Sequence, residues 1–167
     1  TILRYFNAAG ASEDGRFGEY HHPETHLIPL VLQDILQGSG SLKVFGDDYP
    51  TEDGTCIRDY VHIEDLASAH LLAMEAITGD TAEVYNIGTG TGQSVLDIIK
   101  ACEQVSGHQV KYTIVERRPG DAPELVADPR KLQTRLGWKP RYPNIEDTVR
   151  TAWIWHKNKP DGYEKKQ

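Results

Sequence analysis

A short β-prone run leads into a glycine-rich turn at Glu83-Val84-Tyr85-Asn86-Ile87-Gly88-Thr89-Gly90-Thr91-Gly92. Ser94 and Asp97, three residues apart, form a capping-box pattern that predicts a helix over Val95–Ser106. Gly107 follows as a natural C-terminal cap for that helix. A strand, a tight turn and a helix in this order are typical of α/β proteins.

The rest of the chain alternates in the same way, with a loop at Asn7–Glu24 and a turn-rich insert at Gly46–Thr55. The predicted strands are Thr1–Phe6, Leu42–Phe45, Cys56–His62, Glu83–Ile87 and Val110–Val115. The predicted helices are Leu27–Gln37, Ile63–Thr78, Val95–Ser106, a short one from Pro129 that Gly137 ends, and one capped by Asn144 and Asp147 that runs to about Lys157. No linker interrupts this order, so we expect one compact α/β unit over residues 1–167.

Two of these helices carry apolar residues at helical spacing. We expect one face of the 63–78 helix to hold Ile63, Leu66, His70, Met74 and Ile77. We expect the last helix to bury Ile145, Val149, Ala152 and Trp153.

Composition excludes several classes of protein. The chain has 167 residues, of which 38% are hydrophobic and 26% charged, as in an ordinary globular domain. Its formal charge of −7 disfavours a general nucleic-acid-binding surface, and no apolar run is long enough for a membrane helix. Cys56 and Cys102 are the two cysteines, with no C-x-x-C, so we expect a reducing, cytoplasmic setting and neither a disulfide scaffold nor a structural zinc site.

The motifs of cofactor, metal and catalytic chemistry are incomplete. Gln93 stands where the third glycine of a dinucleotide-binding turn belongs, so we interpret Gly88–Gly92 as a tight turn. Pro23 separates His22 from His26, which have helical spacing, and we predict no metal site. No G-x-S-x-G occurs and no tyrosine has a lysine four residues later, so we predict no catalytic residue in this chain.

Two arginine-bearing loops remain, Arg58-Asp59-Tyr60 and Arg117-Arg118-Pro119-Gly120-Asp121. Guanidinium groups bind phosphate oxygens in a bidentate manner, Phe45 offers a face for a base, and Asp121 suits a ribose hydroxyl. The same residues can instead form surface ion pairs, Arg58 with Asp59 and Arg118 with Asp121. On the residues alone, these ion pairs are slightly favoured over a nucleotide site.

A succession of motifs changes that balance. In order they are Arg4–Ala11, Thr25–Pro29, Val44–Gly46, Tyr49–Thr55, Arg58–His62, Asn86–Gly90 and Arg117–Asp121. This succession resembles the C-terminal half of the UDP-glucose 4-epimerase family of extended short-chain dehydrogenases/reductases, from Thr1 to about Tyr163. The stretch Asp48–Thr55 before the arginine is the most specific, because related nucleotide-sugar dehydratases and decarboxylases usually have a shorter turn there.

The resemblance implies a site for a UDP-hexose substrate. It implies that Asn7, Arg58 and Arg118 contact the diphosphate. Phe45 would contact the uracil region, and Asp121 would hold the uridine ribose.

The resemblance also implies roles for residues around this site. Tyr5 would lie near the nicotinamide of NAD, and Leu27 would follow a nucleotide-contacting position at which His26 replaces the family's asparagine. Leu125 would lie beside the C2 substituent of the sugar, and a residue smaller than tyrosine there suggests room for an N-acetyl group.

The implied fold is the C-terminal part of an extended Rossmann-fold enzyme with its small substrate-binding α/β domain. Thr1–Phe6 and Glu83–Ile87 would belong to the Rossmann-like sheet, whose N-terminal half binds most of the NAD. The implied reaction, in galactose metabolism, is transient oxidation at C4 by NAD, and we expect no activity from this chain alone. Open strand edges lead us to expect self-association, as a homodimer or with another chain. A related dehydratase or decarboxylase, and a non-catalytic nucleotide-binding module or remnant, remain the alternatives.

Overall fold

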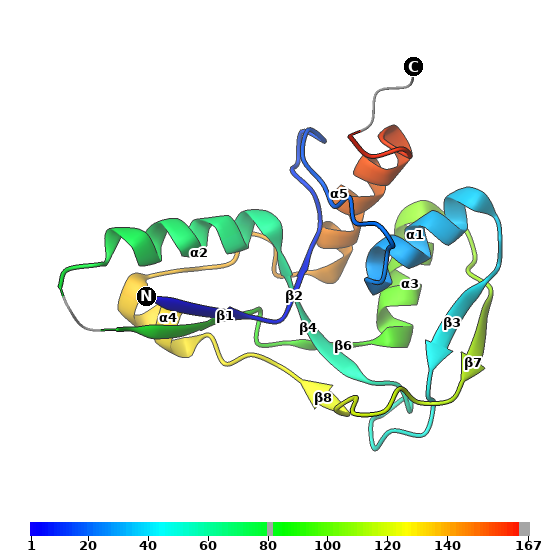
Figure 1. Ribbon diagram of the computed structural model, residues 1–167, viewed down its shortest axis with the longest axis horizontal. Helices are drawn as coiled ribbons and strands as arrows, with labels where there is room; N and C mark the ends of the chain where they lie inside the picture. Colours follow the sequence, from blue (N-terminus) through cyan, green and yellow to red (C-terminus); the bar gives the residue numbers. More distant parts are fainter. Residues whose placement is uncertain (80–81, 164–167) are drawn as a thin grey trace.

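The structure is a computed structural model that describes residues 1–79 and 82–163 (Figure 1). Its strands are β1 (Ile2–Tyr5), β2 (Asn7–Ala9), β3 (Leu42–Phe45), β4 (Ile57–His62), β5 (Val84–Ile87), β6 (Gly92–Ser94), β7 (Tyr112–Val115) and β8 (Glu124–Leu125). Its helices are α1 (Leu27–Gln37), α2 (Ile63–Glu75), α3 (Val95–Ser106), α4 (Arg130–Leu136) and α5 (Ile145–Asn158). The α/β class is confirmed; residues 80–81 and 164–167 of the expected 1–167 unit lie outside the described residues.

The strands form three small groups in which parallel pairing dominates. β1 pairs with β5 in parallel, and β3 pairs with β7 in parallel. β4 is the central strand of the third group, where it pairs in parallel with β2 and β8 and antiparallel with β6.

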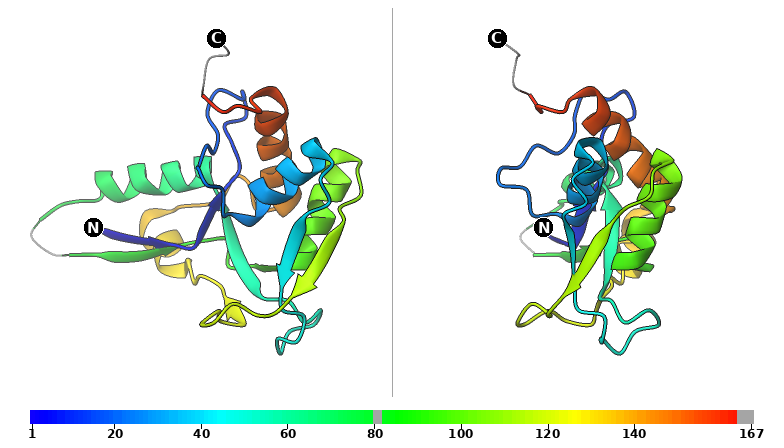
Figure 2. Two further views of the ribbon diagram at one scale, coloured as in Figure 1. Left: turned by 45° about the vertical axis from the view of Figure 1, so that its right-hand side comes forward. Right: turned by 90° about the vertical axis from the view of Figure 1, so that its right-hand side faces the viewer.

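Two lobes lie on either side of β4 (Figures 1 and 2). The helical lobe consists of α1, α3 and α5, which contact one another, with the β3–β7 pair. The strand-pair lobe consists of β1 and β5 with α2 and α4. Successive residues of a strand point to opposite faces, so Tyr60 of β4 packs into the core of the helical lobe and Val61 into that of the strand-pair lobe.

Local capping explains why α3 begins where the sequence predicts. Ser94 Oγ accepts a hydrogen bond from the Asp97 N–H at 3.0 Å, and an Asp97 carboxylate oxygen accepts one from the Ser94 N–H at 3.0 Å. Gly107 ends the helix with φ at 75°, in the left-handed region that a glycine adopts without a Cβ penalty. The predictions for α1, β3 and the insert 46–55 are likewise confirmed.

The expectations for β2 and for the helix after β4 were wrong. Asn7–Ala9, expected in a loop, forms β2 because it pairs with Tyr60–His62. The 63–78 helix ends at Glu75, so Ile77 lies beyond it, and both Met74 and Ile77 are exposed. The buried residues of α2 are Asp65, Ala69 and Ala73.

The last helix differs from its prediction in which tryptophan it buries. Val149 and Ala152 are buried as expected, but Trp155, 1% exposed, is the buried tryptophan, and Trp153 is half-buried. Asn144 occupies the N-cap position without a side-chain cap bond. Strand β7 begins at Tyr112 rather than two residues earlier, and β8 has no counterpart among the predicted strands.

None of the helices in the described ranges has the length and apolar character that crossing a membrane requires.

Candidate functional site

A cavity of about 490 Å³ opens between α1, β3, β4 and the loop that follows β7. Seven of the predicted site residues line it: Asn7, His26, Leu27, Phe45, Arg58, Arg118 and Asp121. Residues from positions 7 to 121 therefore meet at one cavity, and the two predicted arginines share it.

Arg58 lines this cavity and is held by Ile57 of β4 and by the loop 117–122. Its Nη1 donates to the carbonyl oxygens of Ile57 at 2.7 Å and Ala122 at 2.9 Å. Its Nη2 lies 3.2 Å from Asp121 Oδ1, and the Arg58 side chain is 14% exposed. Among the described residues, three of the five N–H groups of the guanidinium are engaged, which leaves two for a ligand.

Arg118 presents its charge more freely. Its guanidinium carbon lies 3.9 Å above the centre of the Phe45 ring, a cation–π contact that holds the side chain over the cavity wall. Within residues 1–79 and 82–163, Arg118 has no ion-pair partner. An exposed cation positioned by an aromatic ring suits an anionic ligand such as a diphosphate.

The sequence offered two ion pairs as the alternative, Arg58 with Asp59 and Arg118 with Asp121, and the structure contains neither pair among its described residues. Arg58 pairs with Asp121 of the other loop, 63 residues away, rather than with Asp59. Asp59 is 1% exposed and accepts hydrogen bonds from the N–H groups of Thr89, Gly90 and Ala127. The ion pair is therefore partly buried, and it joins β4 to the loop 117–122.

This position of Asp59 explains the glycine-rich turn. The amides of Thr89 and Gly90, which a bound phosphate would need, are bonded to the Asp59 carboxylate. A Cβ at Gly88 would lie 2.4 Å from Asp59 Oδ2, so only glycine allows this close approach. The interpretation of Gly88–Gly92 as a structural turn is confirmed, although its last residue already begins β6.

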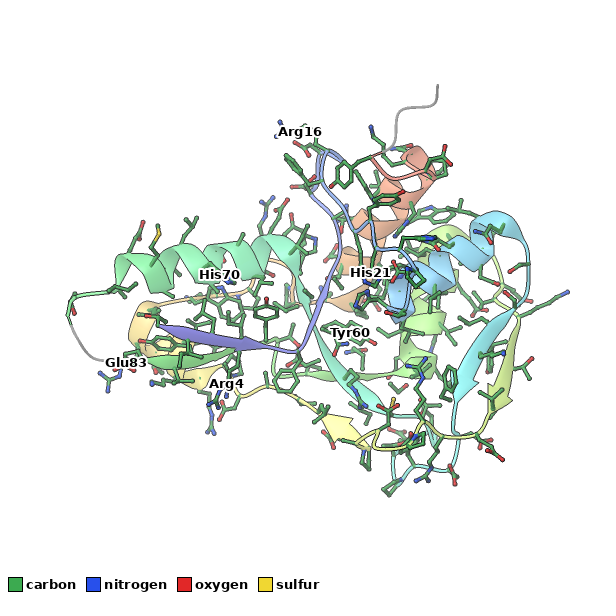
Figure 3. The ribbon with its side chains drawn as sticks, in the orientation of Figure 1. Arg4, Arg16, His21, Tyr60, His70 and Glu83 are labelled. Atoms are coloured by element: carbon green, nitrogen blue, oxygen red, sulfur yellow. The ribbon has the colours of Figure 1, made fainter. Side chains whose placement is uncertain are left out.

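A second cavity, of about 520 Å³, adjoins the first. Asn7, His26, Leu27 and Tyr60 line both cavities, and Figure 3 labels Tyr60 on β4. Tyr5 lines only the second cavity and is 49% exposed. Tyr5, the predicted cofactor residue, therefore lies in a cavity next to the one that the predicted substrate residues line, and Asn7, His26 and Leu27 border both.

Leu125 is the one predicted site residue that lines neither cavity. It lies in β8, where it pairs in register with Arg58, and it is 40% exposed. Its closeness to the site comes from this pairing, which the sequence did not indicate.

Cys56 and Tyr60 line the first cavity, although sequence reasoning assigned neither of them to the site. Burial raises the pKa of the Cys56 thiol, and the charge of Arg58 opposes that effect. Burial also raises the pKa of the Tyr60 hydroxyl, so both side chains stay neutral. Each lies two residues from Arg58 along an extended segment, on the same face as the arginine, and this spacing was the signal that could have identified them.

Next to Arg118, Arg117 stabilises the insert rather than the cavity. Its guanidinium carbon lies 4.2 Å above the Tyr49 ring, and its Nε lies 2.5 Å from Asp48 Oδ1. The two neighbouring arginines therefore have different environments, and only Arg118 faces the cavity.

The loop before α1 brings together donors that could hold a metal. One ligand atom each from His21, Glu24 and His26 lies within 4.8 Å of the others. Helical spacing in the sequence pairs His22 with His26, but His21 is the histidine that joins this group.

Comparison with known proteins identifies relatives along almost the whole chain. The sequence profile of the NAD dependent epimerase/dehydratase family matches residues 1–88. The UDP-glucose 4-epimerase of Lactobacillus helveticus is 51% identical over 167 residues, which are 99% of this chain and 51% of that protein. That of Halalkalibacterium halodurans is 53% identical over 164 residues, 98% of this chain and 49% of that protein.

Solved structures agree with these relatives. A crystal structure of a UDP-glucose 4-epimerase superposes with a TM-score of 0.93 at 49% identity, covering 98% of this chain and 50% of that chain. The enzyme of Bifidobacterium longum, in complex with NAD+ and UDP, gives a TM-score of 0.91 at 41% identity, covering 96% and 48%. The chain spans about half the length of the curated relatives it matches, and its expected fold class is confirmed by this likeness.

Proposed function

The chain belongs to the NAD dependent epimerase/dehydratase family, and we propose that it is the UDP-sugar-binding part of a UDP-glucose 4-epimerase. The resemblance found in the sequence is confirmed at the level of the family. The observation that carries the proposal is the shared cavity of Arg58 and Arg118, which places two guanidinium groups where one diphosphate can contact both.

We propose that each predicted residue acts on one part of UDP. Arg118 and the free N–H groups of Arg58 neutralise the diphosphate, with Asn7 as a neutral hydrogen-bonding partner at the same cavity. Phe45 contacts the uracil region, and Asp121, oriented by its ion pair with Arg58, accepts from the ribose hydroxyls. These contacts anchor the nucleotide and leave the hexose free to turn, as a 4-epimerase requires.

The remaining predicted residues border the sugar and the cofactor. His26 and Leu27 line both cavities, so we propose that they lie where the nucleotide passes from one cavity to the other. Leu125 borders the sugar and leaves room for an N-acetyl group. Replacing it by tyrosine should then weaken UDP-N-acetylglucosamine more than UDP-glucose.

The family is NAD-dependent, but this chain offers few groups to that cofactor. Within the described residues, the amides of the one strand-to-helix glycine turn are bonded to Asp59. We propose that Tyr5 contacts the nicotinamide and that other parts of the whole enzyme hold the dinucleotide. No tyrosine here has a lysine four residues later, so we expect no turnover of UDP-galactose by this chain with NAD.

The whole enzyme would act in galactose metabolism, and we propose a cytoplasmic setting, which the two free thiols support. We also propose self-association through β1. That strand has β5 as its one neighbour among the described residues, and Ile2 and Tyr5 on it are about half exposed. Gel filtration over a hundredfold range of concentration tests this, and a constant monomer volume would contradict it.

Calorimetric titration of the chain with UDP tests the function directly. We expect binding that Arg118→Ala weakens about 10- to 100-fold, since one charge-assisted contact contributes roughly 1.5–3 kcal/mol. The matched control is Arg130→Ala, because Arg130 pairs with Asp128 on the exposed start of α4. Absence of UDP binding, or equal weakening in both variants, would overturn the proposal.

A panel of ligands separates the alternatives. A dehydratase or decarboxylase would prefer the nucleotide sugar of its own reaction over UDP-glucose. A non-catalytic module would bind UDP and UDP-glucose equally, with no added contribution from the hexose.

A further inference from the structure

The segment 19–26, which leads into α1, gathers four titratable side chains around one point. One ligand atom each from His21, Glu24 and His26 lies within 4.8 Å of the others. Glu19 adds a second carboxylate, with its Oε1 2.5 Å from His26 Nδ1. Figure 3 shows His21 beside the N-terminal end of α1.

The side chain of Glu24 is largely buried, and one of its two carboxylate oxygens has no hydrogen-bond partner among the described residues. Its side chain is 7% exposed. Its Oε1 accepts from the N–H groups of Thr25 at 2.7 Å and His26 at 2.8 Å. Its Oε2 is buried, and no group in residues 1–79 or 82–163 donates to it. Leaving a buried carboxylate oxygen without a partner is costly, so a further ligand is expected there.

His26 faces an excess of acceptors. Its Nδ1 lies 2.5 Å from Glu19 Oε1 and 3.0 Å from Glu24 Oε1. An imidazole nitrogen carries one hydrogen at most, so it cannot donate fully to two carboxylates. A cation between these groups would satisfy both carboxylates at once.

We propose that His21, Glu24 and His26 bind a divalent transition metal ion of the Zn²⁺ type. Imidazole nitrogen and carboxylate oxygen are ligands that Zn²⁺ prefers, and two histidines with one glutamate form a known ligand set for it. The Glu19 carboxylate, which contacts the same His26 nitrogen, fills a fourth position.

The geometry needs only a small adjustment. A tetrahedral ion with bonds of about 2.1 Å spaces its ligand atoms roughly 3.4 Å apart. The three atoms, now within 4.8 Å, must draw together by up to about 1.4 Å. The side chain of His21 is 49% exposed, so it can rotate toward Glu24 without disturbing the core.

The ion would fasten the segment 19–26 to the first turn of α1. His26 is the N-cap residue of α1 and makes no side-chain cap bond there. Metal binding would therefore order the residue that borders both cavities. This role is independent of whether the cavity binds UDP.

Titration with Zn²⁺ in competition with a chromophoric chelator, and with Co²⁺ followed by its visible absorption, tests the site. We expect one ion per chain, the intense visible Co²⁺ bands of four-coordination, and a higher Tm with Zn²⁺. His21→Gln should weaken Zn²⁺ binding at least tenfold and abolish the Tm shift.

The matched control is His22→Gln, because His22 is the exposed neighbour that lies outside the ligand group. It should leave Zn²⁺ affinity unchanged. Because His21 is exposed, its replacement should leave the circular dichroism spectrum unaltered. Glu24→Gln serves as a second variant, with the same expected loss. Equal effects of His21→Gln and His22→Gln, or no one-to-one binding by the unaltered chain, would overturn the proposal.

Discussion

The two lobes of this molecule both contain helices and strands, but their hydrophobic cores differ in size. In the helical lobe, α1, α3, α5 and β3 close around a cluster of fourteen buried residues, which reaches β2 and β4. The corresponding cluster of the strand-pair lobe has six. Ile2, Leu71 and Met74 of that smaller lobe are each more than half exposed.

This difference shows where the stability of the chain resides. Burial of apolar surface is the main favourable term in folding, so the lobe with the larger core should resist opening longer. The candidate nucleotide cavity lies mainly on that lobe. The strand-pair lobe, whose apolar residues are partly uncovered, should open locally at a lower free energy.

The largest effect is expected where the two lobes meet. Asp59 accepts four hydrogen bonds, from the N–H and hydroxyl of Thr89, the N–H of Gly90 and the N–H of Ala127. Asp59→Ala leaves one buried and three partly buried donors unpaired, at a cost of about 3–5 kcal/mol in the free energy of unfolding. Urea denaturation followed by circular dichroism measures this.

Asp128→Ala is the control for Asp59→Ala, because the Asp128 side chain is 53% exposed. It should change stability by less than about 1 kcal/mol. If both variants lose the same small amount, Asp59 does not connect the lobes as described.

Substitution of one buried leucine in each core tests the stability of the two lobes separately. Leu32 in α1 and Leu132 in α4 are both 0% exposed, one in each core. Replacement by alanine should cost about 3–4 kcal/mol at Leu32 and about 2–3 kcal/mol at Leu132. The smaller core around Leu132 can relax more into the space left.

Amide hydrogen exchange shows which lobe each substitution destabilises. Leu132→Ala should speed exchange of the β5 amides and leave those of α3 nearly unchanged. Leu32→Ala should speed exchange in α3. Uniform acceleration across both lobes in either variant would mean that they unfold as one unit and that the comparison fails.

Local signals account for the elements that the sequence predicted well. The capping box of Ser94 and Asp97 sets the start of α3, and Gly107 sets its end, without help from distant residues. The start of α1 before Pro29 and the end of α4 at Gly137 rest on similar local constraints.

Contacts between distant segments explain what the sequence did not predict. Asn7–Ala9 becomes a strand only because Tyr60–His62 lies beside it. The exposure of Met74 follows from what packs against α2, which periodicity alone does not reveal.

The same division applies to the candidate site. The family motifs named Phe45, Arg58, Arg118 and Asp121, and the structure brings these four together. Neither motif nor composition indicated that Arg58 would bond the Ala122 carbonyl, since that contact depends on where the loop 117–122 folds back.

The smallest expected effect concerns His62, the last residue of β4 and the N-cap of α2. Its ring is fully buried and stacks on Tyr142 with centroids 3.8 Å apart. Its Nδ1 accepts from the Glu64 N–H at 3.1 Å. Burial lowers the pKa of the His62 imidazole, and the nearby carboxylates of Glu64 and Asp65 only partly oppose this.

Because the pKa of His62 is lower in the folded state than its ordinary value of 6.5, the unfolded chain takes up the proton first as pH falls. The contribution of His62 to stability is therefore complete above pH 6.5 and is lost as pH drops below 6.5 toward the folded pKa. We expect the free energy of unfolding to fall between pH 7.5 and pH 5.5. His62→Gln should flatten this slope but not remove it, since burial also lowers the pKa of His156 in α5.

His108→Gln, at an exposed histidine, should keep the full slope. A slope unchanged by His62→Gln would assign the pH dependence to the helical lobe alone rather than to the junction.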